Sequence, residues 1–162
     1  MRKERMNDRG FSLVELIIVI AIMAILIVVL APQYLRYVER SRNSTDMQNA
    51  RTMMTAIETW AADPQADSSF GGAGSQVQLV VGATSTTVTN PSGSTAGDDA
   101  LEASGLTKGD IKCSSKTSWN TYTIIGTVAD NGGITWDFTS AVDTVANDNF
   151  KNAMKGQTSS DT

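Results

Sequence analysis

The sequence predicts an α+β protein in which one long amino-terminal helix packs against a small antiparallel β-sheet head. Three patterns support this prediction. Residues 11–31 are apolar at every position except Ser12 and Glu15. Apolar residues then recur at intervals of three and four until about residue 62, which is the spacing of an amphipathic helix. Residues 119–128 have a strand-like composition, Ile134, Trp136 and Phe138 alternate with polar residues, and the Gly-containing loop between the two segments is typical of a β-hairpin.

The first element, residues 11–31, has the length and composition of a membrane-spanning helix. Its 21 residues make about 31 Å of helix, which matches the thickness of a hydrocarbon core. The preceding residues 1–10 carry four basic and two acidic side chains, so the positive-inside rule places the amino terminus in the cytoplasm. A cleaved secretory signal peptide is the alternative, but the stretch is longer than a usual signal core and no small-x-small cleavage pattern follows it.

Glu15 is the one charged residue within this apolar stretch. A carboxylate inside a membrane span costs about 2.5–3.5 kcal/mol, and such residues are usually paired and functional. The alternative is that Glu15 lies near enough to the interface for its side chain to reach the lipid headgroups.

Residues 10–15 read GFSLVE, between a short basic leader and a long apolar helix, and this arrangement resembles the class III signal sequence of type IV pilins and pseudopilins. The resemblance implies a type IV pilin-like fold and cleavage by a prepilin peptidase between Gly10 and Phe11. It also implies that Phe11 is N-methylated and that Glu15 neutralises the terminal amine of an adjacent subunit during filament assembly. The single Cys113 and the segment APQYL at residues 31–35 resemble the major pilins of Gram-positive bacteria, including clostridial forms.

The second element, residues 32–63, is expected to continue the helix as an amphipathic segment. Pro32 removes one backbone donor and predicts a kink rather than an end. The pair Asp63-Pro64 predicts the end, because a residue before proline is biased away from the α region. The predicted apolar stripe is Met47, Ala50, Met54, Ile57 and Ala61, and the charged residues Arg36, Glu39, Arg40, Arg42, Asp46 and Arg51 are assigned to the other, mostly solvated faces.

Residues 64–97 are rich in Gly, Ser, Thr and Ala and are expected to form a connector. Alternation at residues 76–81 predicts a short strand there. Residues 84–89 fit either an edge strand or a loop. A glycosylation sequon at Asn43 and the hydroxyl-rich connector suggest sites for sugars, although chance occurrence and a plain solvated loop explain them equally well.

The last segment, residues 98–162, is expected to form a β-rich head with a carboxy-terminal tail. Residues 98–104 predict one or two turns of helix, and residues 119–128 and 134–138 predict the two strands of a hairpin. Trp136 and Phe138 share one strand face and are predicted to bury the long helix against the sheet, and Trp119 is assigned to packing. Residues 147–155 predict a short terminal helix that carries Phe150.

The composition argues against an enzyme and against a cofactor. The chain has no histidine and one cysteine, which excludes imidazole catalysis, His-ligated metals, cysteine zinc clusters and an intrachain disulfide. No phosphate loop or nucleophile elbow occurs, and the scattered carboxylates match no EF-hand pattern. The net charge of −4 argues against direct nucleic-acid binding, which needs clustered Lys and Arg.

The resemblance implies a structural subunit that polymerises into a type IV pilus after leader cleavage, for motility, adhesion or DNA uptake. Its expected partners are copies of itself, the prepilin peptidase, the pilus assembly machinery and the cytoplasmic membrane, which it spans once before it reaches the cell surface. The alternatives are a major pseudopilin of a type II secretion or competence system and a membrane-anchored binding module that does not polymerise.

Overall fold

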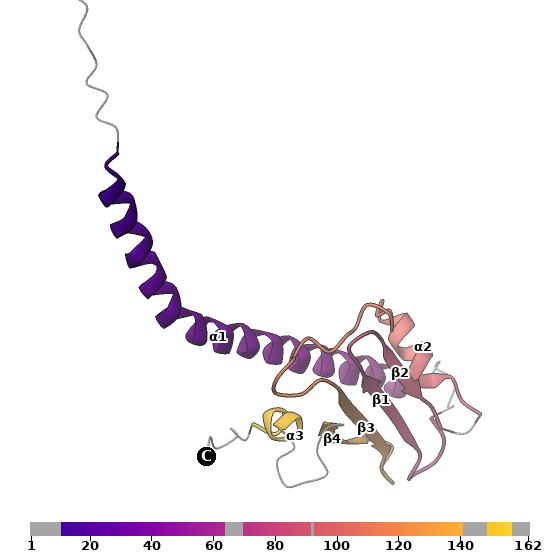
Figure 1. Cartoon of the computed structure of the whole chain (residues 1–162). Coiled ribbons are helices and arrows are strands. Elements are labelled where there is room, and N and C mark those ends of the chain that lie inside the picture. Colours follow the sequence, from indigo (N-terminus) through magenta and orange to yellow (C-terminus); the bar gives the residue numbers. More distant parts are fainter. Residues whose placement is uncertain (1–10, 64–69, 92, 141–148, 157–162) are drawn as a thin grey trace, which may run out of the picture. The chain divides into compact units, whose positions relative to one another are not determined.

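The computed structural model describes residues 11–63, 70–91, 93–140 and 149–156. Its elements in chain order are α1 (Leu13–Ala62), β1 (Gln76–Val81), β2 (Thr86–Thr89), α2 (Ala96–Ala103), β3 (Tyr122–Val128), β4 (Ile134–Ser140) and α3 (Asn149–Met154) (Figure 1). The chain divides after Val38 into two compact units, an amino-terminal unit (residues 1–38) and a head unit (residues 39–162). The predicted leader, residues 1–10, lies outside the described residues.

The described part of the amino-terminal unit is the first half of α1. All side chains of residues 11–37 are exposed, although most of them are apolar. The helix runs through Pro32 without interruption, so the expected continuation beyond the apolar stretch is confirmed. By length and composition, this helix is able to cross a membrane.

The head unit contains a four-stranded antiparallel sheet in the order β2-β1-β3-β4. The strand predicted at residues 76–81 is confirmed as β1, and the Thr-rich segment is resolved as the edge strand β2 rather than a loop. The register of β1, β3 and β4 aligns three cross-strand rows that contribute to the core. They are Val81–Tyr122–Ser140, Leu79–Ile124–Phe138 and Val77–Gly126–Trp136.

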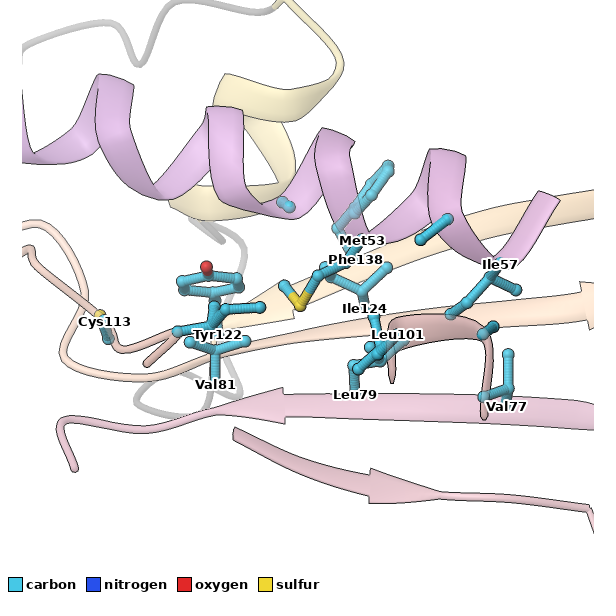
Figure 2. Packing of buried hydrophobic residues seen from close by; sticks show 14 of the residues in the cluster. Met53, Ile57, Val77, Leu79, Val81, Leu101, Cys113, Tyr122, Ile124 and Phe138 are labelled. Atoms are coloured by element: carbon cyan, nitrogen blue, oxygen red, sulfur yellow. The ribbon is translucent and has the colours of Figure 1, made fainter. Parts of the chain in front are cut away.

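The second half of α1 packs on this face of the sheet (Figure 1). Met53 and Ile57 are fully buried, and Figure 2 shows Met53 beside Ile124 and Phe138 and Ile57 on the side of Val77. Burial of each such side chain stabilises the head by about 1.5–3 kcal/mol. The helix and the sheet therefore form one hydrophobic core.

The apolar stripe predicted for α1 is correct at two of its five positions. Ala50 and Ile57 are buried as predicted, but Met47 and Met54 are only half-buried and Ala61 is exposed. The buried face instead runs through Asp46, Ala50, Met53, Ala56 and Ile57. The prediction that Asp46 lies on a solvated face is therefore wrong. Hydrophobicity alone assigns a carboxylate to the surface, whereas the hydrogen-bond donors around Asp46 allow it to be buried.

The two short helices close the head. Gly97 of α2 lies so near the sheet edge that a Cβ there would come within 2.8 Å of Val77 and 2.9 Å of Val88. Phe150 of α3 is fully buried, and its ring stacks on Tyr122 at a centroid distance of 4.2 Å. The short helix predicted for the tail is confirmed at residues 149–154, and residues 147–148 lie outside the described part.

The hairpin prediction is confirmed, with one correction at its start. Phe138 is buried, and the half-buried Trp136 donates its indole N–H to Glu58 of α1 at 2.6 Å, so both rings face the helix as expected. Strand β3 begins at Tyr122, however, and not at Trp119. Trp119 is buried in the preceding loop, where its backbone N–H bonds to the Ser115 hydroxyl instead of to a neighbouring strand.

Candidate functional site

The start of α1 is fixed by two hydrogen bonds of Ser12, one to Glu15 and one from Val14. The backbone N–H of Ser12 donates to Glu15 Oε2 at 2.9 Å, and the Ser12 hydroxyl accepts from the backbone N–H of Val14 at 3.3 Å. The first helical bond follows, from Leu16 N–H to the Ser12 carbonyl at 3.2 Å. This is the S-x-x-E capping box, which satisfies helix donors that otherwise lack partners.

The carboxylate of Glu15 is therefore folded back toward the beginning of the helix, one turn from the proposed cleavage point. Phe11 is 91% exposed, and Gly10 lies outside the described residues. A negative charge in the first turn of a helix is favoured by the helix dipole. The arrangement places an acceptor close to the amine that cleavage before Phe11 would create.

A second polar site lies in the head unit, where Glu39 accepts hydrogen bonds from one loop. Its Oε1 accepts from the Ser115 hydroxyl at 2.6 Å and from the backbone N–H groups of Lys116 at 2.8 Å, Thr117 at 2.8 Å and Ser118 at 3.2 Å. Burial raises the pKa of Glu39, but the hydrogen bonds from Ser115, Thr117, Lys116 and Ser118 outweigh it and lower the pKa to about 2. The carboxylate is thus held in its charged form.

Asp46, seven residues further along α1, binds the same loop from inside the core. It is fully buried. Its carboxylate accepts from the backbone N–H groups of Ser114 at 2.7 Å and Ser115 at 2.9 Å and from the indole N–H of Trp119 at 2.9 Å. Seven residues make about two helical turns, so Glu39 and Asp46 lie on one face of α1. Together with the loop at residues 113–119, they form what we call the carboxylate clamp.

Cys113 lies at the inner end of the clamp and is a free, buried cysteine. Its Sγ is 3.5 Å from Asp46 Oδ2. Burial and the nearby negative charge of Asp46 raise the pKa of this thiol to about 12. The thiol is therefore protonated and unreactive at neutral pH.

The carboxylate clamp is the feature that sequence analysis missed. Glu39 and Asp46 were both assigned to mostly solvated faces of the helix, whereas the Glu39 side chain is only 13% exposed and Asp46 is fully buried. One signal was available in the sequence, because the loop reads CSSKTSW and offers many donors without a strand-like pattern. Two acids spaced seven residues apart on the packed helix are natural acceptors for such a loop.

The sequon at Asn43 has a structural role in the head unit. Its side-chain amide donates to the Ser118 hydroxyl at 2.7 Å, and the residue is partly buried on α1. Asn43 is thus the third residue of α1, besides Glu39 and Asp46, that binds the loop of the carboxylate clamp.

Comparison with known proteins gives the amino-terminal segment a family context. Residues 5–31 match the prokaryotic N-terminal methylation motif. A type IV major fimbrial protein of Dichelobacter nodosus is 46% identical over 66 residues, which cover 40% of this chain and 41% of that protein. No solved structure matches the chain significantly.

Two further relatives agree with this context. A type IV major pilin of Myxococcus xanthus is 35% identical over 72 residues, covering 43% of this chain and 33% of that protein. A prepilin peptidase-dependent protein of Clostridium perfringens is 33% identical over 66 residues, covering 41% of this chain and 47% of that protein. The chain spans less than half the length of the curated relatives it matches. The resemblance to type IV pilins, clostridial forms included, is therefore confirmed, and it is carried by the methylation motif and by a long helix packed on an antiparallel sheet.

Proposed function

We propose that this chain is a structural subunit that polymerises into a type IV pilus. The observation that carries the proposal is the exposure of residues 13–31 of α1, which are apolar except for Glu15 and lie within the methylation motif. Each large apolar side chain that becomes buried contributes about 1.5–3 kcal/mol. A helix of this kind is stable in a membrane or in a bundle of similar helices, and a pilin occupies these two environments in turn.

The proposed maturation uses the residues that the motif supplies. A prepilin peptidase cuts between Gly10 and Phe11, and the new terminus at Phe11 is N-methylated. Glu15 then leaves its capping box with Ser12 and pairs with the terminal amine of a neighbouring subunit. Pairing is needed because an amine or a carboxylate buried alone among apolar helices is strongly unfavourable. The pair also sets the register between helices, as one buried polar residue does in a coiled coil.

The proposed organisation keeps the segments inferred from the sequence. Residues 1–10 form the leader, residues 11–31 the membrane and assembly helix, residues 32–63 its amphipathic continuation with a kink at Pro32, residues 64–97 a connector with strands, and residues 98–162 the rest of the head. The precursor spans the cytoplasmic membrane once with its amino terminus inside. Contacts between copies are heterologous and do not close, so they generate a fibre at the cell surface. The subunit acts without a cofactor and without catalysing a reaction.

The test is Glu15→Ala in cells that produce the protein, with Glu102→Ala as the control because Glu102 is an exposed carboxylate of the head. Mass spectrometry of the amino terminus should find both variants cut before Phe11 and methylated. Electron microscopy of sheared surface material should show long filaments for the control and few or none for Glu15→Ala. Normal filaments from Glu15→Ala, or an unprocessed wild-type chain, would contradict the proposal, and short fibres from the wild type would indicate a pseudopilin instead.

A further inference from the structure

Three neighbouring residues of the amino-terminal unit differ in chemistry from the apolar surface before them. Tyr34 is 66% exposed and Tyr37 is 73% exposed, and Arg36 between them is also exposed. All three lie within α1, where neither ring packs into a core. We call Tyr34, Arg36 and Tyr37 the aromatic belt.

The position of the aromatic belt along the helix is set by the apolar residues before it. From Leu13 to Pro32, α1 makes about 30 Å of helix, which is the thickness of a hydrocarbon core. The aromatic belt begins at Tyr34, two residues or about half a turn beyond that length. At about 100° per residue, Tyr34 and Tyr37 lie on one side of the helix and Arg36 lies on the side facing away from Tyr34. Polar tips therefore occupy more than one side of the helix at about one level.

The chemistry at this level is that of a lipid headgroup region. A tyrosine ring is apolar along its body and polar at its hydroxyl, which favours the boundary between hydrocarbon and water. An arginine at the same level pairs with phosphate, and its long stem lies along the apolar chains. Glu39 follows three residues later, but its carboxylate already binds the loop of the carboxylate clamp and Arg42. Arg36 has no ion pair among the described residues.

We propose that the aromatic belt anchors the unassembled precursor at the bilayer surface on the head side, with Arg36 binding the phosphate of an anionic phospholipid. This proposal rests on the membrane-inserted precursor of the proposed function. A neighbouring apolar helix is a poorer occupant, because it offers no acceptor to the guanidinium and would leave it desolvated. The anchor fixes the depth of the helix in the bilayer until assembly.

The experiment uses the full chain reconstituted into phosphatidylcholine bilayers that contain spin-labelled phosphatidylglycerol or spin-labelled phosphatidylcholine. The measured quantity is the ratio of the two association constants at the protein surface. Since one basic residue near an anionic surface contributes about 1 kcal/mol, Arg36→Gln should lower this ratio by up to about fivefold. Arg51→Gln is the matched control, because Arg51 is an exposed arginine of the same helix in the head unit. It should leave the ratio unchanged.

The predicted leader is also basic and attracts the anionic lipid too. The test is therefore the difference in the ratio between wild type and Arg36→Gln, and not the wild-type ratio itself. High salt should reduce this difference, because the interaction is partly exposed. An unchanged ratio in Arg36→Gln, or an equal decrease in Arg51→Gln, would refute the anchoring role of the aromatic belt. Neither result would contradict the proposal that the precursor is inserted in the membrane. A wild-type chain that alkaline carbonate extracts from the bilayer would instead refute the precursor itself.

A second measurement tests the two tyrosines. A spin label at Gln33→Cys reports depth through its accessibility to oxygen and to a water-soluble nickel chelate, and the native Cys113 is buried and does not react. The double substitution Tyr34→Leu and Tyr37→Leu should move the label deeper into the hydrocarbon. Tyr34→Trp and Tyr37→Trp should keep its depth, because tryptophan shares the interfacial preference. An unchanged depth in the leucine variant would refute the role of the tyrosines.

Discussion

Removal of the Asp46 carboxylate should strongly destabilise the head. Asp46→Ala leaves three N–H donors without their acceptor, namely the backbone N–H groups of Ser114 and Ser115 and the indole N–H of Trp119. Asp46 is fully buried, so water cannot replace the carboxylate without opening the loop. The substitution also creates a small cavity beneath the loop, beside the fully buried Ala50.

The expected size follows from the cost of each lost contact. A hydrogen bond to a charged group contributes about 1.5–3 kcal/mol, and breaking a buried charged network costs about 3–5 kcal/mol in total because such contacts do not add independently. We expect Asp46→Ala to lower the free energy of unfolding by about 4 kcal/mol. Asp46→Asn keeps the side-chain shape and one acceptor oxygen, but its new amide N–H groups face N–H donors of the loop. It should lower the free energy of unfolding by about 2–3 kcal/mol.

The assay is urea unfolding of the full chain in detergent micelles, followed by tryptophan fluorescence, because the ring of Trp119 contacts the carboxylate directly. With a denaturant slope of about 2 kcal/mol/M, the midpoint should fall by about 2 M for Asp46→Ala. Asp110→Ala is the control, since Asp110 is exposed in the head, and should shift the midpoint by less than about 0.5 M. A shift for Asp46→Ala as small as that of the control would refute the reasoning.

Three further predictions concern the head. Because the pKa of Glu39 is lowered from 4.5 to about 2 in the folded state, its charged form stabilises the head by about 3 kcal/mol above pH 4.5, and this contribution is lost as the pH falls toward 2. Glu39→Gln should remove this part of the pH dependence in acid unfolding curves, and parallel curves for the two proteins would contradict the prediction. Cys113, with a pKa raised to about 12, should resist iodoacetamide at pH 8 in the native chain and react once urea unfolds the protein. Mass spectrometry of the intact chain measures the alkylation. Rapid alkylation of the native chain would argue against the burial of Cys113. Gly97→Ala should lower the unfolding midpoint, because the added Cβ would lie 2.8 Å from Val77. The resulting overpacking costs about 1–3 kcal/mol, whereas the gain in helix propensity is at most about 1 kcal/mol. Gly109→Ala is the control and should not lower the midpoint, because a Cβ there meets no atom within 4 Å.

The elements of this protein were predictable where one local pattern determined them. The first half of α1 follows from an apolar run with no glycine, and its end at Ala62 follows from the proline at residue 64. β1 and the hairpin follow from alternation and from a loop with Gly132 at φ 79°, a left-handed turn conformation. Patterns of this kind depend on sequence neighbours alone, so no tertiary information was needed.

The buried face of α1 was not predictable to the residue, because it depends on what packs against it. The hydrophobic pattern around Ala50 and Ile57 fits two faces about equally well, one through Met54 and one through Met53. The structure selects the face with Met53, since the same rotation turns Asp46 toward the donors of the loop at residues 113–119. A polar contact between residues almost seventy positions apart thus decides which apolar residues are buried.

The carboxylate clamp also changes the explanation of how a head without a disulfide is stabilised. Without an intrachain disulfide, strand pairing and apolar burial are the stabilising interactions that the sequence predicts. A disulfide acts largely by restricting the unfolded chain, and it responds to reductants. The carboxylates of Glu39 and Asp46 act only in the folded state, where they satisfy the backbone of a loop that has no strand partner. Stability of this loop should therefore depend on proton concentration and be insensitive to redox conditions, since its one thiol, on Cys113, is free and buried.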